Sequence, residues 1–253
     1  MALRQSENKS TAHKKMDSAL EMGHAGGMST TPTPRQRARE EMEQRILATA
    51  RAQMAEVGPA QLSLRAVARE LGVASSAVYR YVESRDELLT RLILVVFGEL
   101  ADAAEAGCAD TSADLATQWS HWAHAMRDWA RAHPYDWALV YGTPIPGYAA
   151  PRDTVEPATR VLGHALRIMG HVHGEVSDPA AKASLAPMSE FAHAFGVTIE
   201  VGSASSLAAI AAWSTIQGFI NLELGGHFVG GLLDADPVFE QVVARTAEQL
   251  GLS

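Results

Sequence analysis

The segment from Ser75 to Tyr81 carries side chains whose types and spacing suit hydrogen bonding to a nucleic acid. The hydroxyls of Ser75 and Ser76 both donate and accept, and the methyl group of Ala77 could meet a thymine methyl. Because these three side chains are small, a helix that begins with them can approach base edges closely. Longer polar side chains follow, namely Tyr79, Arg80 and Tyr81, with Arg85 just beyond. The pattern points to a DNA-reading surface, and the alternative for each residue is a solvated helix face.

Two short helices joined by a tight turn are expected to position these side chains. Ser63 is a suitable N-cap for a helix over residues 64–71, and Gly72 ends that helix. A second short helix is predicted over residues 75–81. Such a pair is a helix-turn-helix, in which the second helix lies in the major groove and its N-terminal residues meet base edges.

Apolar periodicity predicts an all-α chain. Ala and Leu dominate the apolar residues, which favours helix over strand. A helix over residues 35–57 precedes the pair, with Pro34 in its first turn, and a long helix from Ser84 to about residue 107 follows the pair. The breaks at Pro and Gly predict later helices over residues 111–133, 135–142, 153–174, 178–196, 204–225 and 236–251. Residues 196–202 could form a short strand instead.

Charge is unevenly distributed along the chain. The net charge is -8, yet residues 35–91 hold ten Arg against eight acidic residues, whereas residues 92–253 hold seven basic against eighteen acidic residues. A mildly basic head on an acidic body suits a protein that touches phosphate at one end only. The alternative is a chance scatter of charges, which this bias alone does not defeat.

The composition favours a cytoplasmic protein without membrane contact. Cys108 is the one cysteine, which excludes a disulfide within the chain and fits a reducing compartment. No stretch reaches the roughly 20 unbroken apolar residues of a membrane-spanning helix. Residues 1–34 are rich in Ser, Thr, Gly, Met and Lys and lack the apolar centre of a secretory signal. We expect them to form a disordered tail.

The stretch from Leu62 to Leu89 resembles the signature of the TetR family of transcriptional regulators. The shared features are a helix-opening Ser, a turn sequence, two aromatic residues and the start of the next helix: Ser63, Leu71-Gly72-Val73, Tyr79 and Tyr81, and Ser84-Arg85 with Leu88-Leu89. The resemblance extends over about residues 43–95. Ala74, Val78 and Arg85 stand where Ser, Leu and Lys are usual, and none of these departures costs the fold.

The resemblance implies an N-terminal three-helix DNA-binding domain over residues 35–83 and a larger helical ligand-binding and dimerisation domain over residues 84–253. Its DNA partner would be a double-stranded operator. The implied phosphate contacts are Ser63, Arg65, Tyr79, Tyr81 and Arg85, the implied base contacts are Ser75, Ser76 and Ala77, and Arg80 would meet either a guanine edge or a phosphate. Phosphate contacts position such a protein without specifying sequence.

Two segments of the body resemble one branch of the family. They are Trp129–Trp137 and Trp213–Glu223, where Gln217 replaces the usual His. The Trp residues at 119, 122 and 129 form a helical stripe with Met126, and the commoner role of such a stripe is core packing. Because the family encloses an apolar cavity in this domain, we also expect some of nine residues to line it: Trp119, Trp122, Met126, Trp129, Tyr141, Phe191, Phe195, Trp213 and Gln217.

The resemblance further implies a homodimer formed through about residues 204–225 and 236–251. A two-fold dimer would present two recognition helices to a near-palindromic operator. A small-molecule effector in the body would shift the helix that begins at Ser84 and change the spacing of those helices. Most family members repress and release DNA when ligand binds, but the sequence is also compatible with a ligand-dependent activator.

An enzyme is the main alternative class. His121 and His124 lie one turn apart, and the run from His171 to Glu175 contains a candidate metal trio, but neither matches a complete zinc spacing. No phosphate-binding glycine loop or nucleophile elbow occurs, so we expect no catalytic residue, no metal and no cofactor. A helical protein whose DNA-binding motif is vestigial is a third alternative. Acidic replacements of Tyr79, Tyr81 or Arg85 would indicate it, and there are none.

Overall fold

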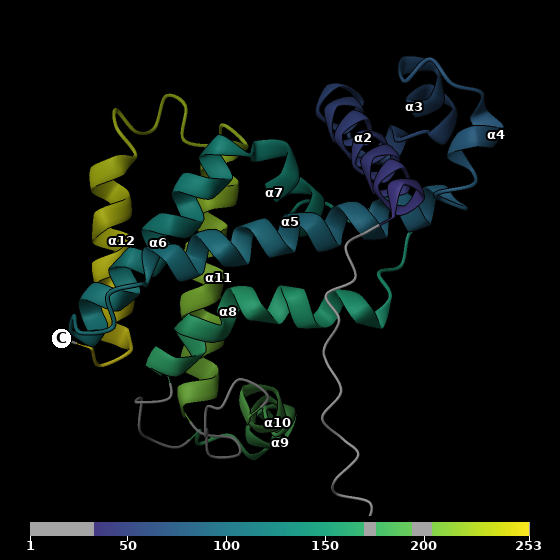
Figure 1. The fold of residues 1–253 in the computed structure, drawn as a ribbon. Helices are drawn as coiled ribbons and strands as arrows, with labels where there is room; N and C mark the ends of the chain where they lie inside the picture. Colours follow the sequence, from purple (N-terminus) through teal and green to yellow (C-terminus); the bar gives the residue numbers. More distant parts are fainter. Residues whose placement is uncertain (1–32, 170–175, 194–203, 253) are drawn as a thin grey trace, which may run out of the picture. The chain divides into compact units, whose positions relative to one another are not determined.

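The computed structural model describes residues 33–169, 176–193 and 204–252, and Figure 1 shows the helices that they form. Every regular element in these ranges is helical, which confirms the all-α prediction. The chain divides into two compact units, residues 1–42 and 43–253, and each is described by itself. The predicted domain boundary between residues 83 and 84 falls inside the second unit and stays a prediction.

Helix α2, Pro34–Val57, begins in the first unit and continues into the second. The Gln36 side-chain oxygen accepts from the Thr33 backbone N–H at 2.7 Å, and the Thr33 hydroxyl oxygen accepts from the Gln36 backbone N–H at 3.2 Å. This reciprocal capping box satisfies donors that the first helical turn leaves free. Pro34 occupies the first turn, as predicted.

The helix-turn-helix comprises α3, Leu64–Glu70, and α4, Ser75–Val78, and follows the short 3-10 helix η1, Pro59–Gln61. Helix α4 ends three residues before the predicted end at residue 81. The backbone N–H of Arg80 donates to the carbonyl of Ala77, and that of Tyr81 to the carbonyl of Val78. These bonds span three residues instead of four, so the end of the recognition helix tightens into a turn.

The body is built around α5, Arg85–Gly107, which packs against α6, Leu115–Ala132, α7, Pro134–Tyr141, and α8, Val155–Met169. Ser84 caps α5 as predicted, because its hydroxyl accepts from the Glu87 backbone N–H at 3.1 Å. One face of α5 is apolar and buried: Leu88, Leu89, Leu92, Ile93, Val96, Phe97 and Leu100. The 3-10 helix η2, Arg152–Thr154, leads into α8.

The C-terminal part contains α9, Pro179–Ser184, α10, Pro187–His193, α11, Ala204–Leu224, and α12, Asp236–Gln249. The prediction of one helix over residues 178–196 was wrong, because Pro187 lacks the N–H and has the ring that a continuous helix cannot accommodate. Helices α11 and α12 pack against each other and against α6. The strand considered for residues 196–202 and the end of the predicted helix 153–174 lie outside the described residues.

The buried guanidinium of Arg127 fixes α6 to the last two helices. It donates to both carboxylate oxygens of Glu223 on α11, at 2.7 and 2.6 Å, and to Asp236 on α12 at 2.7 Å. Its carbon lies 4.7 Å from the centre of the Phe239 ring. Hydrogen bonds to these carboxylates raise the pKa of Arg127. The hydrogen bond from Arg127 in turn lowers the pKa of Asp236.

Candidate nucleic-acid interface and ligand cavity

The turn between α3 and α4 depends on Gly72, whose φ is +69°. A side chain is strained in this left-handed conformation, which explains the residue type at this position. The Val73 backbone N–H then bonds back to the Ala68 carbonyl at 3.0 Å and closes the turn. Val67 and Val78 are buried beneath it, so the two short helices are held by apolar contacts on one side.

The opposite side of the helix-turn-helix presents the candidate DNA-binding residues. Tyr79 is 45% exposed, and Arg65, Ser76 and Arg80 are also exposed. The remaining candidates are half-buried: Ser63, Ser75, Ala77, Tyr81 and Arg85. The structure thus brings most of the predicted residues together on the two short helices and the segments that flank them, whereas Arg85 begins α5.

Ser63 occupies the N-cap position of α3, but its hydroxyl makes no capping hydrogen bond. Its backbone N–H donates instead to the side-chain oxygen of Gln53 at 2.9 Å. The start of α3 is therefore tied to α2 through Gln53, and this tie was not visible in the sequence.

Arg85 is held by protein atoms. One of its terminal nitrogens donates to the carbonyl oxygens of Pro59 and Ala60 at 3.2 and 2.9 Å, and the other lies 3.5 Å from a carboxylate oxygen of Asp86. The first turn of α5 is thereby fastened to η1, directly before the helix-turn-helix. Sequence reasoning placed Arg85 at phosphate and missed this contact, because a guanidinium bond to backbone carbonyls leaves no pattern in the sequence.

A three-residue ion cluster joins α2 to the body. The Arg51 guanidinium contacts both carboxylate oxygens of Asp136 on α7, at 2.7 to 2.9 Å, and both of Glu99 on α5, at 2.6 and 3.0 Å. Hydrogen bonds to these two carboxylates raise the pKa of Arg51. Asp136 is buried, so its charge depends on Arg51 for compensation. Sequence analysis did not single out any of the three residues.

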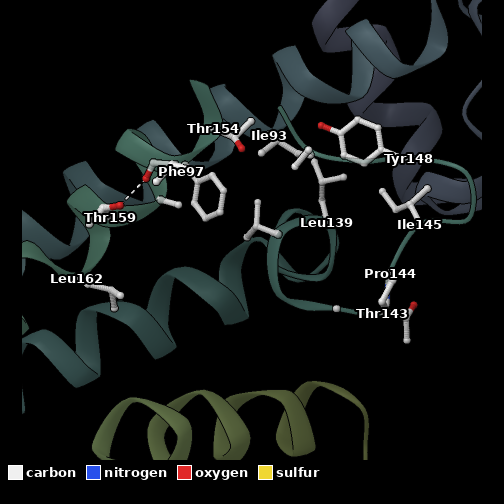
Figure 2. A pocket seen from close by; sticks show the side chains of 15 residues that line it. Ile93, Phe97, Leu139, Thr143, Pro144, Ile145, Tyr148, Thr154, Thr159 and Leu162 are labelled. Atoms are coloured by element: carbon white, nitrogen blue, oxygen red, sulfur yellow. Dashed lines mark hydrogen bonds between the residues drawn. The ribbon is translucent and has the colours of Figure 1, made fainter. Parts of the chain in front are cut away.

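A cavity of about 610 Å³ lies among α5, α7, α8 and the segment between α7 and η2. Figure 2 shows Phe97 and Leu139 facing this space, with Tyr148 and Ile145 on the side of the connecting segment. Its lining is mostly apolar: Ile93, Phe97, Leu139, Val140, Pro144, Ile145, Ala150, Val155, Ala158 and Leu162, with Gly142, Thr143, Tyr148, Thr154 and Thr159. This volume is in the range of pockets that hold drug-sized molecules.

The cavity wall is hydrogen-bonded to the start of α5. The Tyr148 hydroxyl lies 2.9 Å from the Thr90 hydroxyl, one turn beyond Arg85. The wall segment that carries Tyr148 is thus connected to the part of α5 that Arg85 fastens to η1.

The tryptophan stripe lies in the core of the body. Trp119 and Trp122 are fully buried and stacked, with ring centres 5.0 Å apart. Their indole N–H groups donate to the Thr246 hydroxyl at 2.8 Å and to the Val161 carbonyl at 3.2 Å. Met126 and Trp129 are buried on the same helix. The polar atoms of these two tryptophans therefore have partners within the protein.

None of the seven predicted ligand residues whose side chains the structure describes lines the larger cavity. Trp122 and Trp213 line a smaller cavity of about 170 Å³ among α6, α8, α10 and α11. Tyr141 contacts Phe97, which does line the larger one, with ring centres 6.0 Å apart, and burial raises the pKa of Tyr141. Gln217 is half-buried on α11. The Phe191 side chain and the whole of Phe195 lie outside what the structure describes.

The histidines with metal-like spacing have other partners where they are described. His124 contacts the Glu240 carboxylate at 2.8 Å and the Ser120 carbonyl at 2.8 Å, whereas His121 is exposed. Within the described ranges, no three His, Cys, Asp or Glu side chains come together as a metal site. The trio that ends at Glu175 lies outside those ranges. Cys108 is buried, and burial raises its pKa to about 11, which disfavours a reactive thiolate.

A helix-turn-helix followed by a helical body with an apolar cavity defines a DNA-binding transcriptional regulator. Residues 46–92 match the family of bacterial regulatory proteins described as the tetR family, and residues 119–246 match a tetracyclin repressor-like C-terminal domain. Two similar curated proteins are the HTH-type transcriptional regulators Rv1816 of Mycobacterium tuberculosis and Mb1846 of Mycobacterium bovis. Each is 39% identical over 217 residues, which is 81% of this chain and 91% of the relative.

Two solved structures are similar to this chain over most of its length. The crystal structure of SCO4313 is 33% identical with a TM-score of 0.71 and covers 85% of this chain and 100% of its own. A Rhodococcus sp. RHA1 protein of unknown function is 25% identical with a TM-score of 0.58, over 90% of this chain and 99% of its own. The chain belongs to the TetR family of transcriptional regulators. This membership confirms the predictions of the family and of a regulator rather than an enzyme.

Proposed function

We propose that the chain is a ligand-responsive repressor that binds a near-palindromic operator as a homodimer and is released by a small, largely apolar effector. One observation carries this proposal. The helices that bound the large cavity, α5 and α7, also hold the polar contacts to α2 and η1, next to the helix-turn-helix. A molecule in the cavity would therefore touch the elements that fix the DNA-binding residues.

The candidate contacts divide by their place on the recognition helix. Ser75, Ser76 and Ala77 form its first turn and would face base edges in the major groove. Arg80 follows the C-terminal end of the helix, which favours phosphate over a guanine edge. Tyr79 and Tyr81 would add phosphate contacts, with Ser63 and Arg65 at the start of α3.

Helix α7 is the proposed route of coupling. It carries Asp136 of the ion cluster and, one turn later, the cavity residues Leu139 and Val140. A ligand that shifts α7 would move Asp136 away from Glu99 and pull on Arg51 in α2. It would do so only if it binds the DNA-free arrangement more tightly than the DNA-bound one.

Helix α11 supports the proposed dimer. Its stretch Ser206–Leu224 is long and apolar enough to cross a membrane, yet only 28% of its most apolar part is buried within the chain. A second copy packed on α11 and α12 would cover this surface. The resulting dimer would present two recognition helices to one operator. We place the dimer in the cytoplasm, because its operator is bacterial DNA.

The proposal is tested first by recovery of genomic DNA fragments on the purified chain, followed by affinity measurements against salt concentration. We expect a near-palindromic site and binding that weakens steeply as salt rises, because phosphate contacts release counterions. Addition of a cavity ligand should then lower the affinity for that site.

Two results would contradict this proposal. Recovery of random DNA alone, with and without cavity ligands, would mean that the helix-turn-helix does not select an operator. If operator affinity rises when ligand is added, the chain is not a repressor that ligand releases from DNA. It would then bind DNA in response to ligand, as a ligand-dependent activator does.

A further inference from the structure

We infer that the large cavity selects an uncharged, mainly apolar ligand that carries a hydrogen-bond donor, such as an alcohol. The inference rests on the proposed function, since it names the chemical class of the effector. Its basis is the state of three hydroxyls in the cavity lining, those of Tyr148, Thr154 and Thr159, whose hydrogens are used within the protein.

The cavity lining offers no partner for a charged ligand. Its fifteen residues include no Asp, Glu, Lys, Arg or His. A carboxylate or an ammonium group in the buried part of the cavity, beside Phe97, Leu139 and Thr159, would be removed from water without an opposite charge, which is strongly unfavourable. The ligand is therefore neutral where it contacts these residues.

Two buried threonine hydroxyls in the lining donate their hydrogens to backbone carbonyls. Thr154 donates to the carbonyl of Pro151 at 2.7 Å, and Thr159 donates to the carbonyl of Val155, one turn earlier on α8. Figure 2 shows the second of these bonds. A hydroxyl has one hydrogen and two lone pairs, so each of these oxygens is left only as an acceptor.

The same argument holds for Tyr148. The Thr90 hydroxyl donates to the carbonyl of Asp86 at 3.0 Å, so its hydrogen is used. In the 2.9 Å contact between the two hydroxyls, Tyr148 must therefore be the donor. Its oxygen, too, is left only as an acceptor.

These three oxygens favour a ligand donor over a ligand acceptor. A donor on the ligand gains a hydrogen bond without disturbing the protein, whereas a ligand acceptor gains one only if a hydroxyl gives up its present partner. Thr143, the remaining hydroxyl of the lining, is exposed and has water available. The cavity therefore distinguishes an alcohol from the corresponding ether.

The test is a calorimetric comparison of three probes that share a ten-carbon chain and differ in their polar group, namely 1-decanol, 1-methoxydecane and decanoate. Each is titrated into the full chain at neutral pH. We expect 1-decanol to bind roughly tenfold more tightly than the ether, the equivalent of one net hydrogen bond. Decanoate, which is ionised at neutral pH, should bind most weakly.

Two variants locate the effect. The double variant Thr154→Val and Thr159→Val keeps the shape of the lining but removes two acceptors, so the preference for 1-decanol over the ether should shrink. Ala158→Phe fills the cavity and should weaken binding of both neutral probes. The comparison of probes on the unaltered chain stands by itself if either variant fails to fold.

The inference is overturned if the ether matches the alcohol, if decanoate binds most tightly, or if none of the three binds. Operator affinity measured in the same samples separates it from the proposed function. A preference for the alcohol without any change in operator affinity supports the ligand class and contradicts the effector response. Release of DNA by decanoate alone supports the effector response and contradicts the ligand class.

Discussion

Arg85 ties the start of α5 to η1, directly before the helix-turn-helix. Its guanidinium bonds to two adjacent carbonyls of η1 are bonds from a charged group, which are stronger than neutral ones. The planar guanidinium fixes the position of this terminal nitrogen at the end of a rigid group, whereas a lysine ammonium ends a flexible stem that reaches less far. The two residues are therefore not interchangeable here.

We expect Arg85→Lys and Arg85→Ala to lower the stability of the chain by about 1 kcal/mol each and to weaken operator binding to a similar degree. The reason is that both lose the fastening of α5 to η1, although lysine keeps the positive charge. The measurements are thermal unfolding and operator affinity. If Lys restores operator affinity while Ala does not, the charge itself acts on phosphate and the clamp is secondary.

His164 on α8 is expected to make stability depend on pH. It is buried, Arg167 lies 3.0 Å from its Nδ1, and its Nε2 has no hydrogen-bond partner among the described residues. Burial, and then the Arg167 charge, lower its pKa below the ordinary 6.5. The unfolded chain therefore binds a proton at pH values where the folded chain does not, and stability falls as the pH drops below 6.5.

The check is urea unfolding across neutral to mildly acidic pH for the unaltered chain, for His164→Gln and for His121→Gln. Loss of the buried imidazole should flatten the pH dependence in the first variant. His121 is exposed, so its replacement should leave the profile unchanged. Equal profiles for all three proteins would show that His164 does not contribute to acid sensitivity.

The exposed positions of the helix-turn-helix were predictable from sequence, and the residues that line the cavity were not. The helix-turn-helix is local, so spacing along the chain determines which of Ser76, Tyr79 and Arg80 face outward. The cavity is formed by α5, α7 and α8 with a connecting segment, and its lining depends on packing between distant parts of the chain. The tryptophan stripe was predicted to line the ligand cavity but is buried in the core, because large aromatic rings also fill cores.

Most helix positions followed from caps and breaks, because these signals act within a few residues. Pro34, Gly72 and Ser84 mark boundaries that the structure places where they were expected. The single helix predicted over residues 178–196 failed because its apolar pattern continued across Pro187. Contacts between elements, such as Arg51 with α5 and α7, could not be predicted because they join residues 48 and 85 positions apart.

The Arg51 cluster is expected to couple the cavity to α2. Arg51→Met keeps the packing of the stem but removes the charge shared by Asp136 and Glu99. Stability should fall by about 2 kcal/mol, less than for a fully buried pair because Arg51 and Glu99 are partly exposed. The change in operator affinity caused by a cavity ligand should shrink, since α7 no longer pulls on α2.

Arg160→Met is the matched control. Arg160 also bridges two carboxylates, Asp102 and Glu105, but these lie on α5 and the bridge stays between α5 and α8. Its loss should leave the ligand response of operator affinity unchanged. A normal response in Arg51→Met, or an equal loss in Arg160→Met, would contradict coupling through the cluster.

At the scale of the whole molecule, one face of α11 has no covering element among the residues that the structure describes. Leu207, Ile210 and Leu222 are 50%, 42% and 45% exposed, and helical spacing places them with Gly218 on one face. A side chain at Gly218 would meet nothing within 4 Å in the chain, so the space beside it is open. The opposite face, with Ile216, is buried by the body. Helix α11 thus has an inner apolar face and an outer one.

An apolar outer face of this kind is a candidate for subunit association. We expect the double variant Leu207→Glu and Ile210→Glu to be monomeric in sedimentation equilibrium, because each interface would bury four added carboxylates around its two-fold axis. Operator affinity should fall by roughly a hundredfold or more, since a monomer engages one half-site and loses the gain from binding two together.

Val95→Glu provides the comparison, because Val95 is also an exposed apolar residue, 39% exposed on α5, and its replacement adds one negative charge away from α11. It should stay dimeric with unchanged operator affinity. A double variant on α11 that remains dimeric would place the interface elsewhere. A monomeric variant that keeps full affinity would show that one copy reads the operator alone. Only a loss of both properties together ties the outer face of α11 to a dimer that holds two recognition helices, whose spacing a cavity ligand would change under the proposed mechanism.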